Sequence, residues 1–192
     1  MITRASAITI SALFLICFLP SVVRAQHRDH LTPQEVDLIK DTQVLDKRID
    51  VFIRAAERRV LVLTGTASAN TNAKQLKKDA EKWGELPSGN PGELVSDVAR
   101  IFDEAITNID DVSARDEKNP LIPKALRKLA AAATRIVDEV KPFAAKAQSP
   151  AETNSFDQLT ENAEAIAQAT SKLPPEVSKK EKNKEEKPKT NN

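Results

Sequence analysis

Two histidines, His27 and His30, are the side chains of this sequence best suited to bind a transition metal, and they lie close together beside Asp29. A copper or nickel site at an amino terminus needs histidine as the third residue, whereas His27 is the second residue of a chain that starts at Gln26. Soft or borderline metals also require several converging ligands, which the rest of the sequence does not supply. We therefore predict no metal site, and we expect copper affinity to be unchanged when both histidines are removed.

Nucleophilic catalysis is a second chemistry that the sequence argues against. The single cysteine, Cys17, lies in an apolar stretch near the start, and the large residues Leu15 and Ile16 before it do not suit a lipid-attachment site. No cysteine follows Cys17 and no histidine follows His30, so Ser–His and Cys–His arrangements, disulfides and a His- or Met-ligated haem lack their residues. Gly-rich phosphate loops and the HExxH motif are also missing from the sequence. We predict a protein without catalytic residues or a cofactor.

A dense group of oxygen-bearing side chains in the second half of the chain could suggest a calcium site. The group consists of Asn108, Asp110, Asp111, Asp116 and Glu117. It lacks the alternating acids and the glycine of an EF-hand loop. We predict that it forms a solvated helix end.

Basic side chains gather along one side of a predicted helix and could dock an anionic partner. Lys47, Arg54 and Arg58 lie along this side, with Arg48 and Arg59 nearby. Asp50 lies four residues before Arg54, a spacing typical of ion pairs within a helix. We therefore predict that this side of the helix is an ordinary solvated face.

The composition indicates an all-α protein. The chain of 192 residues has 4 glycines, no tyrosine, 6 phenylalanines and 1 tryptophan, although 40% of its residues are hydrophobic. Sheet sandwiches and dinucleotide-binding folds need glycine-rich turns or loops. Charged residues make up 30% of the chain and are nearly balanced, without the basic excess typical of nucleic-acid binding. We predict no nucleic-acid partner.

The amino-terminal segment has the pattern of a signal peptide. Arg4 is the only charge before the uncharged stretch 5–23, whose apolar centre ends at Pro20. Modest or small side chains at Val23 and Ala25 predict cleavage after Ala25 and export to the periplasm or the exterior. The alternative is an uncleaved anchor, because the uncharged stretch approaches the length that spans a bilayer. Cleavage leaves 27 basic and 28 acidic side chains, a net charge of −1, and we then expect no stable membrane insertion.

Capping patterns mark the helix starts. A capping residue, a proline and a later glutamate occur together at 32–35, 90–93 and 149–152. A fourth start is expected near Asn119 and Pro120 or just past Pro123. Apolar residues spaced by three or four then predict four amphipathic helices, over 33–63, 94–112, 124–140 and 156–173.

These helices predict an up-and-down antiparallel bundle of four main helices plus one short helix. The first helix, over 33–63, would be ~45 Å long and capped by Gly65. A short helix from Ala73 to Trp83 is expected to cover its excess length, with Trp83 as a core anchor. The predicted organisation is a signal peptide over 1–25, a flexible mature amino terminus over 26–31, the bundle over 32–175 and a disordered Lys/Glu-rich tail over 176–192.

One short motif resembles that of a known group of proteins. Residues 31–35, Leu-Thr-Pro-Gln-Glu, resemble the LTxxQ element of periplasmic helical chaperones and envelope-stress regulators, with Glu35 where that family has Gln. The resemblance implies a cradle-shaped dimer that holds unfolded clients.

The sequence favours an exported, non-catalytic helical-bundle protein of the cell envelope. It would serve as a binding or structural module for an unidentified protein partner, as a monomer or a homodimer. The alternative is a periplasmic chaperone or stress-sensor-like protein that binds unfolded or apolar clients. An enzyme that uses carboxylates ranks third, because no paired acid and base is apparent in the sequence.

Overall fold

The computed structural model describes residues 28–66 and 73–175, with side chains described from Lys78 onward in the second range. The predicted signal peptide, the predicted tail and His27 lie outside the described residues, as do residues 67–72. The described part is all-helical, as predicted, and contains no strand. Its six helices are α1 (Pro33–Asp41), α2 (Leu45–Leu63), α3 (Ala73–Trp83), α4 (Pro91–Arg115), α5 (Leu121–Ala144) and α6 (Pro150–Ser171). Of these six, none is both long and apolar enough to cross a membrane.

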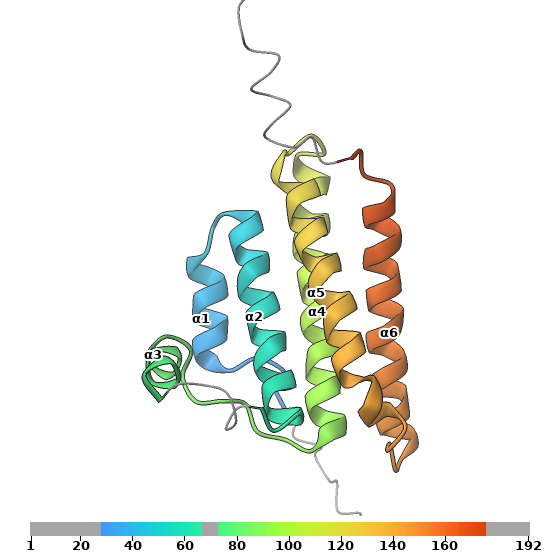
Figure 1. The fold of residues 1–192 in the computed structure, drawn as a ribbon. Helices are drawn as coiled ribbons and strands as arrows, with labels where there is room; N and C mark the ends of the chain where they lie inside the picture. Colours follow the sequence, from blue (N-terminus) through green and yellow to red (C-terminus); the bar gives the residue numbers. More distant parts are fainter. Residues whose placement is uncertain (1–27, 67–72, 176–192) are drawn as a thin grey trace, which may run out of the picture.

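Four of the helices form a bundle around the antiparallel pair α4 and α5. Helix α2 packs against both members of this pair, and α6 packs against the same two helices. Figure 1 shows α2 and α6 on opposite sides of the pair, with chain direction alternating from α2 to α4, α5 and α6. Helix α1 runs antiparallel beside α2, and α3 lies next to α1 at the edge of the molecule. The arrangement therefore consists of a four-helix bundle and an outer layer made of α1 and α3.

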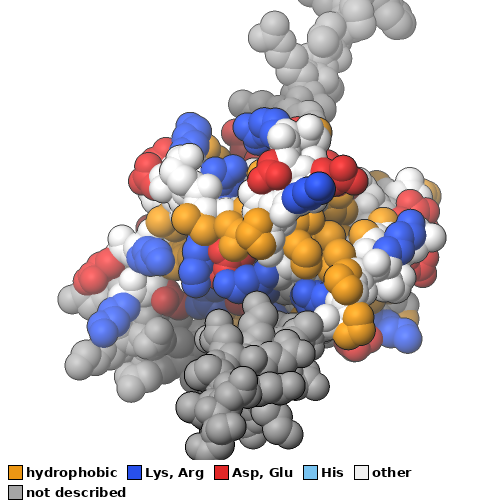
Figure 2. Space-filling model, turned by 90° about the horizontal axis from the view of Figure 1, so that it is seen from above, with side chains coloured by type: hydrophobic (Ala, Val, Ile, Leu, Met, Phe, Trp, Pro, Cys, Tyr) orange, Lys and Arg blue, Asp and Glu red, His pale blue; other side chains and the backbone are white. Residues whose placement is uncertain are grey.

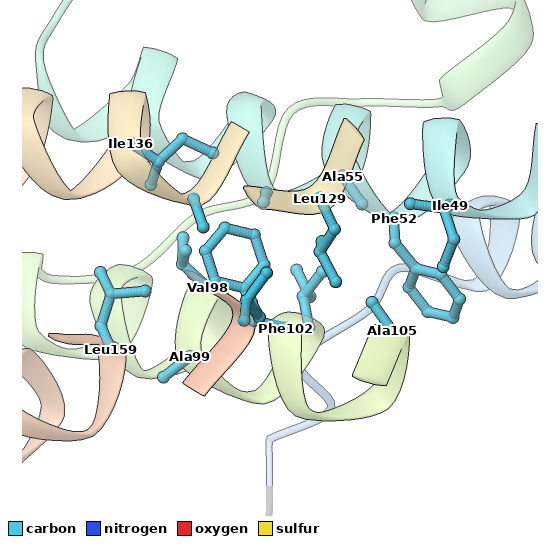
Figure 3. Packing of buried hydrophobic residues seen from close by; sticks show 14 of the residues in the cluster. Ile49, Phe52, Ala55, Val98, Ala99, Phe102, Ala105, Leu129, Ile136 and Leu159 are labelled. Carbon is cyan, nitrogen blue, oxygen red and sulfur yellow. The ribbon is translucent and has the colours of Figure 1, made fainter. Parts of the chain in front are cut away.

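The hydrophobic core lies between the four bundle helices. Phe52 of α2 and Phe102 of α4 are fully buried among aliphatic side chains (Figure 3). Helix α5 contributes Leu129 and Ile136, and α6 contributes Leu159, all of which are also shielded from solvent. These positions follow the three- and four-residue spacings in the sequence, so the predicted apolar stripes of the bundle helices are confirmed as the core.

The predicted long helix over 33–63 is wrong, because the chain breaks between Asp41 and Leu45. Thr42 and Val44 have extended backbone angles, with ψ of 96° and 122°. Both are β-branched residues that favour a helix weakly. The Thr42 carbonyl oxygen accepts a hydrogen bond of 2.7 Å from Arg48 Nε, which holds the turn. The chain can therefore fold back, and α1 lies beside α2 instead of extending it.

The predicted capping patterns position three helices. The reciprocal side-chain and backbone hydrogen bonds of a capping box are complete at two starts (Thr32 with Glu35, Asn90 with Glu93). At the third start, Ser149 Oγ accepts from the Glu152 N–H, but the Glu152 carboxylate accepts from the Gln148 N–H. Helix α5 begins at Leu121 with Pro120 at its N-cap, so the predicted start near Asn119 and Pro120 is confirmed, and the alternative start past Pro123 is wrong. The helix continues through Pro142 in its last turn.

Two glycines with positive φ allow a matched test of the loop next to α3. Gly65 has φ 68° and Gly84 has φ 70°. A Cβ at Gly65 would meet nothing within 4 Å, whereas a Cβ at Gly84 would lie 2.9 Å from Gln34 Cδ. We expect Gly65→Ala to lower the free energy of unfolding by about 1–2 kcal/mol through its left-handed backbone. Gly84→Ala should lower the free energy of unfolding by about 0.5 kcal/mol more than Gly65→Ala does, because Gln34 must change its rotamer.

Urea denaturation followed by circular dichroism measures both losses. Adding Gln34→Ala should remove the extra loss of Gly84→Ala and leave that of Gly65→Ala unchanged. An extra loss that persists without the Gln34 side chain would contradict this explanation.

Candidate functional site

The densest charged chemistry of the described residues is buried where the outer layer meets the bundle. Glu35 of α1, Arg58 and Arg59 of α2, and Asp97 of α4 have exposed fractions of 0%, 3%, 1% and 4%. We call these four side chains the charge cluster. Arg58 and Arg59 were predicted to belong to a solvated side of the helix, and this prediction is wrong for both, because α1 and the end of α3 cover them. A buried charge is costly unless it is paired, so the partners of these groups define what the site does.

Glu35 pairs with both arginines of the cluster. Its Oε1 atom lies 2.6 Å from Arg59 Nη1 and 3.4 Å from Arg58 Nη1. Its Oε2 atom accepts a hydrogen bond of 2.9 Å from the Thr32 N–H, which is the capping bond predicted from the sequence. Arg59 also donates to the His30 carbonyl oxygen at 2.6 Å. One carboxylate therefore caps α1 and attaches it to α2.

Arg58 attaches α3 and the turn that follows it. Its guanidinium donates to the Trp83 carbonyl oxygen at 2.6 Å and to the Gly84 carbonyl oxygen at 3.0 Å, and also to the carbonyl oxygen of Glu85. It lies 5.8 Å from the centre of the Trp83 ring, a distance that allows a cation–π contact. Burial lowers the pKa of Arg58, against the opposing effect of Glu35. Trp83 is buried as predicted, but against this arginine and outside the main hydrophobic cluster.

Asp97 binds Arg28, one of the residues that precede α1. Arg28 Nη2 lies 2.6 Å from Asp97 Oδ2, and Arg100 Nη1 donates to the Arg28 carbonyl oxygen at 3.2 Å. Burial raises the pKa of Asp97, although Arg28 and other cations nearby lower it. His30 Nε2 lies 2.9 Å from Glu104 Oε2. The segment that was predicted to be a flexible mature amino terminus is thus held against α4 from Arg28 onward.

The side chains of the charge cluster are suited to attaching the outer helices to the bundle. Arginine keeps its proton throughout the physiological range, so Arg58 and Arg59 cannot exchange protons with a substrate. Guanidinium groups instead form several directional hydrogen bonds to carboxylates and carbonyls. Here those bonds join α1, the residues before it and the end of α3 to the bundle.

Two open clefts lie beside the charge cluster. One, of about 430 Å³, lies at the starts of α4 and α6 and is lined by Arg28, Arg100 and capping residues of both helices. The other, of about 610 Å³, lies between residues 28–34 and the loop 84–88. In the first cleft, Asn90, Glu93, Ser149 and Glu152 already form capping hydrogen bonds. Most of its polar side chains are therefore used by the fold.

The remaining residues of the predicted basic face are paired within the molecule. Arg54 Nη2 lies 2.6 Å from Asp79 Oδ2 of α3, and Arg48 Nη1 donates to Asn108 Oδ1 at 3.1 Å. Lys47 lies 3.8 Å from Asp50. The predicted pairing of Asp50 with Arg54 is wrong, because Asp50 lies 2.7 Å from Lys128 of α5.

The predicted solvated acidic group is confirmed in part. Asp110, Asp111, Asp116 and Glu117 are exposed, but α4 continues to Arg115, so the first two lie within the helix and not at its end. Asn108 differs from the acids because its side chain hydrogen-bonds to Arg48 and to the Glu104 carbonyl oxygen. No group of three potential metal ligands occurs within the residues that the structure describes.

A second set of ion pairs, between α2 and α5, was missed from the sequence. Asp46 is buried at the start of α2, and its Oδ2 atom lies 2.6 Å from Lys124 Nζ and 3.2 Å from Lys128 Nζ. The hydrogen bond from Lys124 and the nearby charge of Lys128 lower the pKa of Asp46, despite the opposing effect of its burial. An acidic residue in the apolar pattern of a predicted helix was the only local sign of these ion pairs. It could not identify the partners, because they lie about eighty residues further along the chain.

The lowered pKa of Asp46 predicts how stability depends on pH. The ion pairs stabilise the fold fully above the ordinary carboxyl pKa of 3.8, and this contribution is lost as the pH falls through the lower value of the folded state. We expect Asp46→Asn to reduce the free energy of unfolding at pH 7 by up to about 1 kcal/mol, and this difference should shrink below pH 3.8. Urea denaturation at several pH values measures it. Asp97→Asn is the control with the opposite slope, because burial raises the pKa of Asp97.

Comparison of the chain with known protein families, with curated proteins and with solved structures gave no match.

Proposed function

We propose that this chain is an exported, non-catalytic helical-bundle protein of the cell envelope that acts as a binding or structural module for a protein partner. The pattern of Arg4, the uncharged stretch 5–23 and Ala25 supports export. The observation that supports a binding or structural module is that the buried charged groups hold helices together. In the charge cluster and in the cleft at the starts of α4 and α6, carboxylates and guanidinium groups form capping bonds and ion pairs that fix helices to one another.

Charge supports a protein partner over nucleic acid. Residues 26–175 contain 21 basic and 24 acidic side chains, a net charge of −3. Capture of nucleic acid relies on a basic excess that neutralises phosphates. A partner that recognises the mixed charges of helix faces fits this surface better.

The first test of the proposal is the amino terminus of the exported protein. We expect amino-terminal sequencing of protein recovered from the envelope or the medium of an expressing bacterium to start at Gln26. Ala25→Phe should block processing, because a signal peptidase requires a small residue at this position, whereas Gln26→Phe should not. Recovery of the unprocessed chain from the membrane would support the anchor alternative instead.

The second test is the mass of the exported chain in solution. Light scattering after size exclusion distinguishes the monomer from the homodimer, and circular dichroism of the same sample checks its helix content. Residue-specific photo-crosslinking in intact cells would then capture the partner, with a probe at exposed positions of α6 compared with one on α4. The absence of any crosslinked protein from both faces would argue against the binding proposal.

The chaperone alternative depends on exposed apolar surface. Figure 2 shows a band of hydrophobic side chains across the end of the molecule that is seen from above. Among the described residues the exposed large hydrophobic side chains are Val44, at 50%, and Leu86, at 41%. A chaperone would suppress the aggregation of an unrelated unfolding protein at near-stoichiometric ratio, and Val44→Asp or Leu86→Asp should weaken this effect if these exposed side chains bind clients. No suppression over a wide range of ratios would remove this alternative.

A further inference from the structure

Three arginines of α2 pair with groups of the outer layer. Arg54 and Arg58 lie one helical turn apart, and Arg59 follows; we call these three residues the arginine face. Its partners from outside α2 belong mainly to α1, α3 and the residues next to them. Arg59 pairs with Glu35, Arg58 binds the end of α3, and Arg54 lies 2.6 Å from Asp79.

The groups that occupy the arginine face resemble those of an acidic protein ligand. Glu35 and Asp79 supply carboxylates. The carbonyl oxygens of Trp83, Gly84 and Glu85 supply the negative end of a helix and the turn after it. Three side chains of one helix thus bind two acids and a helix carboxyl end, which together have the chemistry of an acidic helical peptide.

From Lys78 onward, where its side chains are described, α3 is attached to α2 mainly through these polar contacts. Trp83 is the buried aromatic residue of α3, and it lies outside the main hydrophobic cluster. The pair of Arg54 and Asp79 is partly exposed, with side-chain exposed fractions of 35% and 32%. Contacts of this kind weaken when another anion competes for the guanidinium groups, whereas the apolar core of the four bundle helices does not.

We propose that the arginine face is a binding surface for an acidic protein segment, and that α3 and the turn after it cover its Arg54 and Arg58 side as an internal competitor. A buried guanidinium cannot be left without a partner, so a ligand that displaces the cover must supply carboxylates or carbonyl oxygens of its own. A ligand that binds only the uncovered form shifts the population toward that form. This inference rests on the proposed binding function and names the chemistry of the partner.

Trp83 provides a local reporter, because it is the one tryptophan of the chain. Its ring lies beside Arg58 and is buried, so release of α3 should move its fluorescence emission to longer wavelength. The experiment titrates the exported full chain with a short polyglutamate peptide and follows Trp83 emission together with helix content by circular dichroism. We expect a saturable red shift with the helix content of the bundle retained. Sodium chloride at equal ionic strength should give a smaller shift.

Two variants of the same ion pair distinguish a binding surface from a purely structural contact. Asp79→Asn removes a group of the cover and leaves the arginine face intact, so the polyglutamate concentration at half-saturation should fall by about two- to fivefold. Arg54→Gln removes a group of the face itself, so that concentration should rise by a similar factor. A structural role alone predicts the same effect for both variants, since both break one pair. Asp50→Asn, which breaks a pair between α2 and α5, is the control and should change nothing.

Several outcomes would overturn the inference. They are the absence of a red shift at saturating polyglutamate, equal effects of Asp79→Asn and Arg54→Gln, or a red shift accompanied by loss of the bundle's helix content. A response to a sulfated polysaccharide without one to polyglutamate would also overturn it, in favour of a carbohydrate ligand. Polyglutamate that binds only the six lysines of residues 176–192 would leave Trp83 emission unchanged. A partner crosslinked to α6 or α4 would leave the proposed function standing if this inference failed.

Discussion

Replacement of Glu35 by alanine is expected to lower the free energy of unfolding by about 3–5 kcal/mol. The Glu35 carboxylate is fully buried and pairs with Arg59 at 2.6 Å and with Arg58 at 3.4 Å. Its removal leaves two buried guanidinium groups short of a carboxylate. It also removes the capping bond to the Thr32 N–H.

Two further variants separate these effects. Glu35→Gln keeps a side-chain oxygen for the capping bond but removes the charge. It should therefore lower the free energy of unfolding by most of the amount expected for Glu35→Ala. Asp37→Ala changes an exposed acid of the same helix and should alter stability by less than about 0.5 kcal/mol. Urea denaturation followed by circular dichroism gives all three values. A loss below about 1 kcal/mol for Glu35→Ala would mean that the charge cluster contributes little to the fold.

Replacement of Phe102 by alanine is expected to cost a similar amount, about 3–5 kcal/mol, for a different reason. Phe102 is fully buried on α4, the helix that contacts α2, α5 and α6. Removing its ring leaves a cavity within the hydrophobic cluster, and close-packed neighbours fill such a cavity only in part. The loss should be the same at low and high salt, unlike that of Glu35→Ala, because no charge is involved.

Phe143→Ala is the matched control for this cavity. Phe143 is partly buried in the last turn of α5, so its removal leaves less empty volume and should cost clearly less than Phe102→Ala. Denaturation by urea compares the two variants under the same conditions. Equal losses would contradict the position of Phe102 at the centre of the core.

Local patterns in the sequence predicted most of the helices. Capping residues and prolines placed the starts of α1, α4 and α6, because a cap is a contact between residues two or three positions apart. The three- and four-residue spacing of apolar side chains also predicted the buried faces of the bundle helices. Where a feature depends on neighbours in sequence, the sequence was informative.

The break between α1 and α2 could not be predicted from the same spacing. Leu38, Thr42 and Leu45 continue the apolar pattern through the turn, so the period alone favours a single helix. The weak helix preference of Thr42 and Val44 was the available local signal. It took effect because Glu35 gains a buried arginine partner 24 positions away when the chain folds back.

The charge cluster was missed for a related reason. Glu35 already had a local explanation as a capping residue, so nothing required a distant partner. Arg59, however, lies seven residues after Phe52 and three after Ala56, which places it on the buried stripe of its helix. A basic side chain on an apolar stripe is a signal that an acid lies opposite, and Glu35 is that acid.

The contacts of Arg58 have a consequence for which substitutions the protein tolerates. Its guanidinium binds the carbonyl oxygens of Trp83, Gly84 and Glu85, which belong to the main chain. Any amino acid supplies a carbonyl oxygen, so position 85 is free to vary in side chain without loss of the contact. Arg58 has no such freedom, because no other side chain carries a fork of donors with the same reach. Related chains should therefore keep arginine at position 58, whereas the residue type at position 85 should vary.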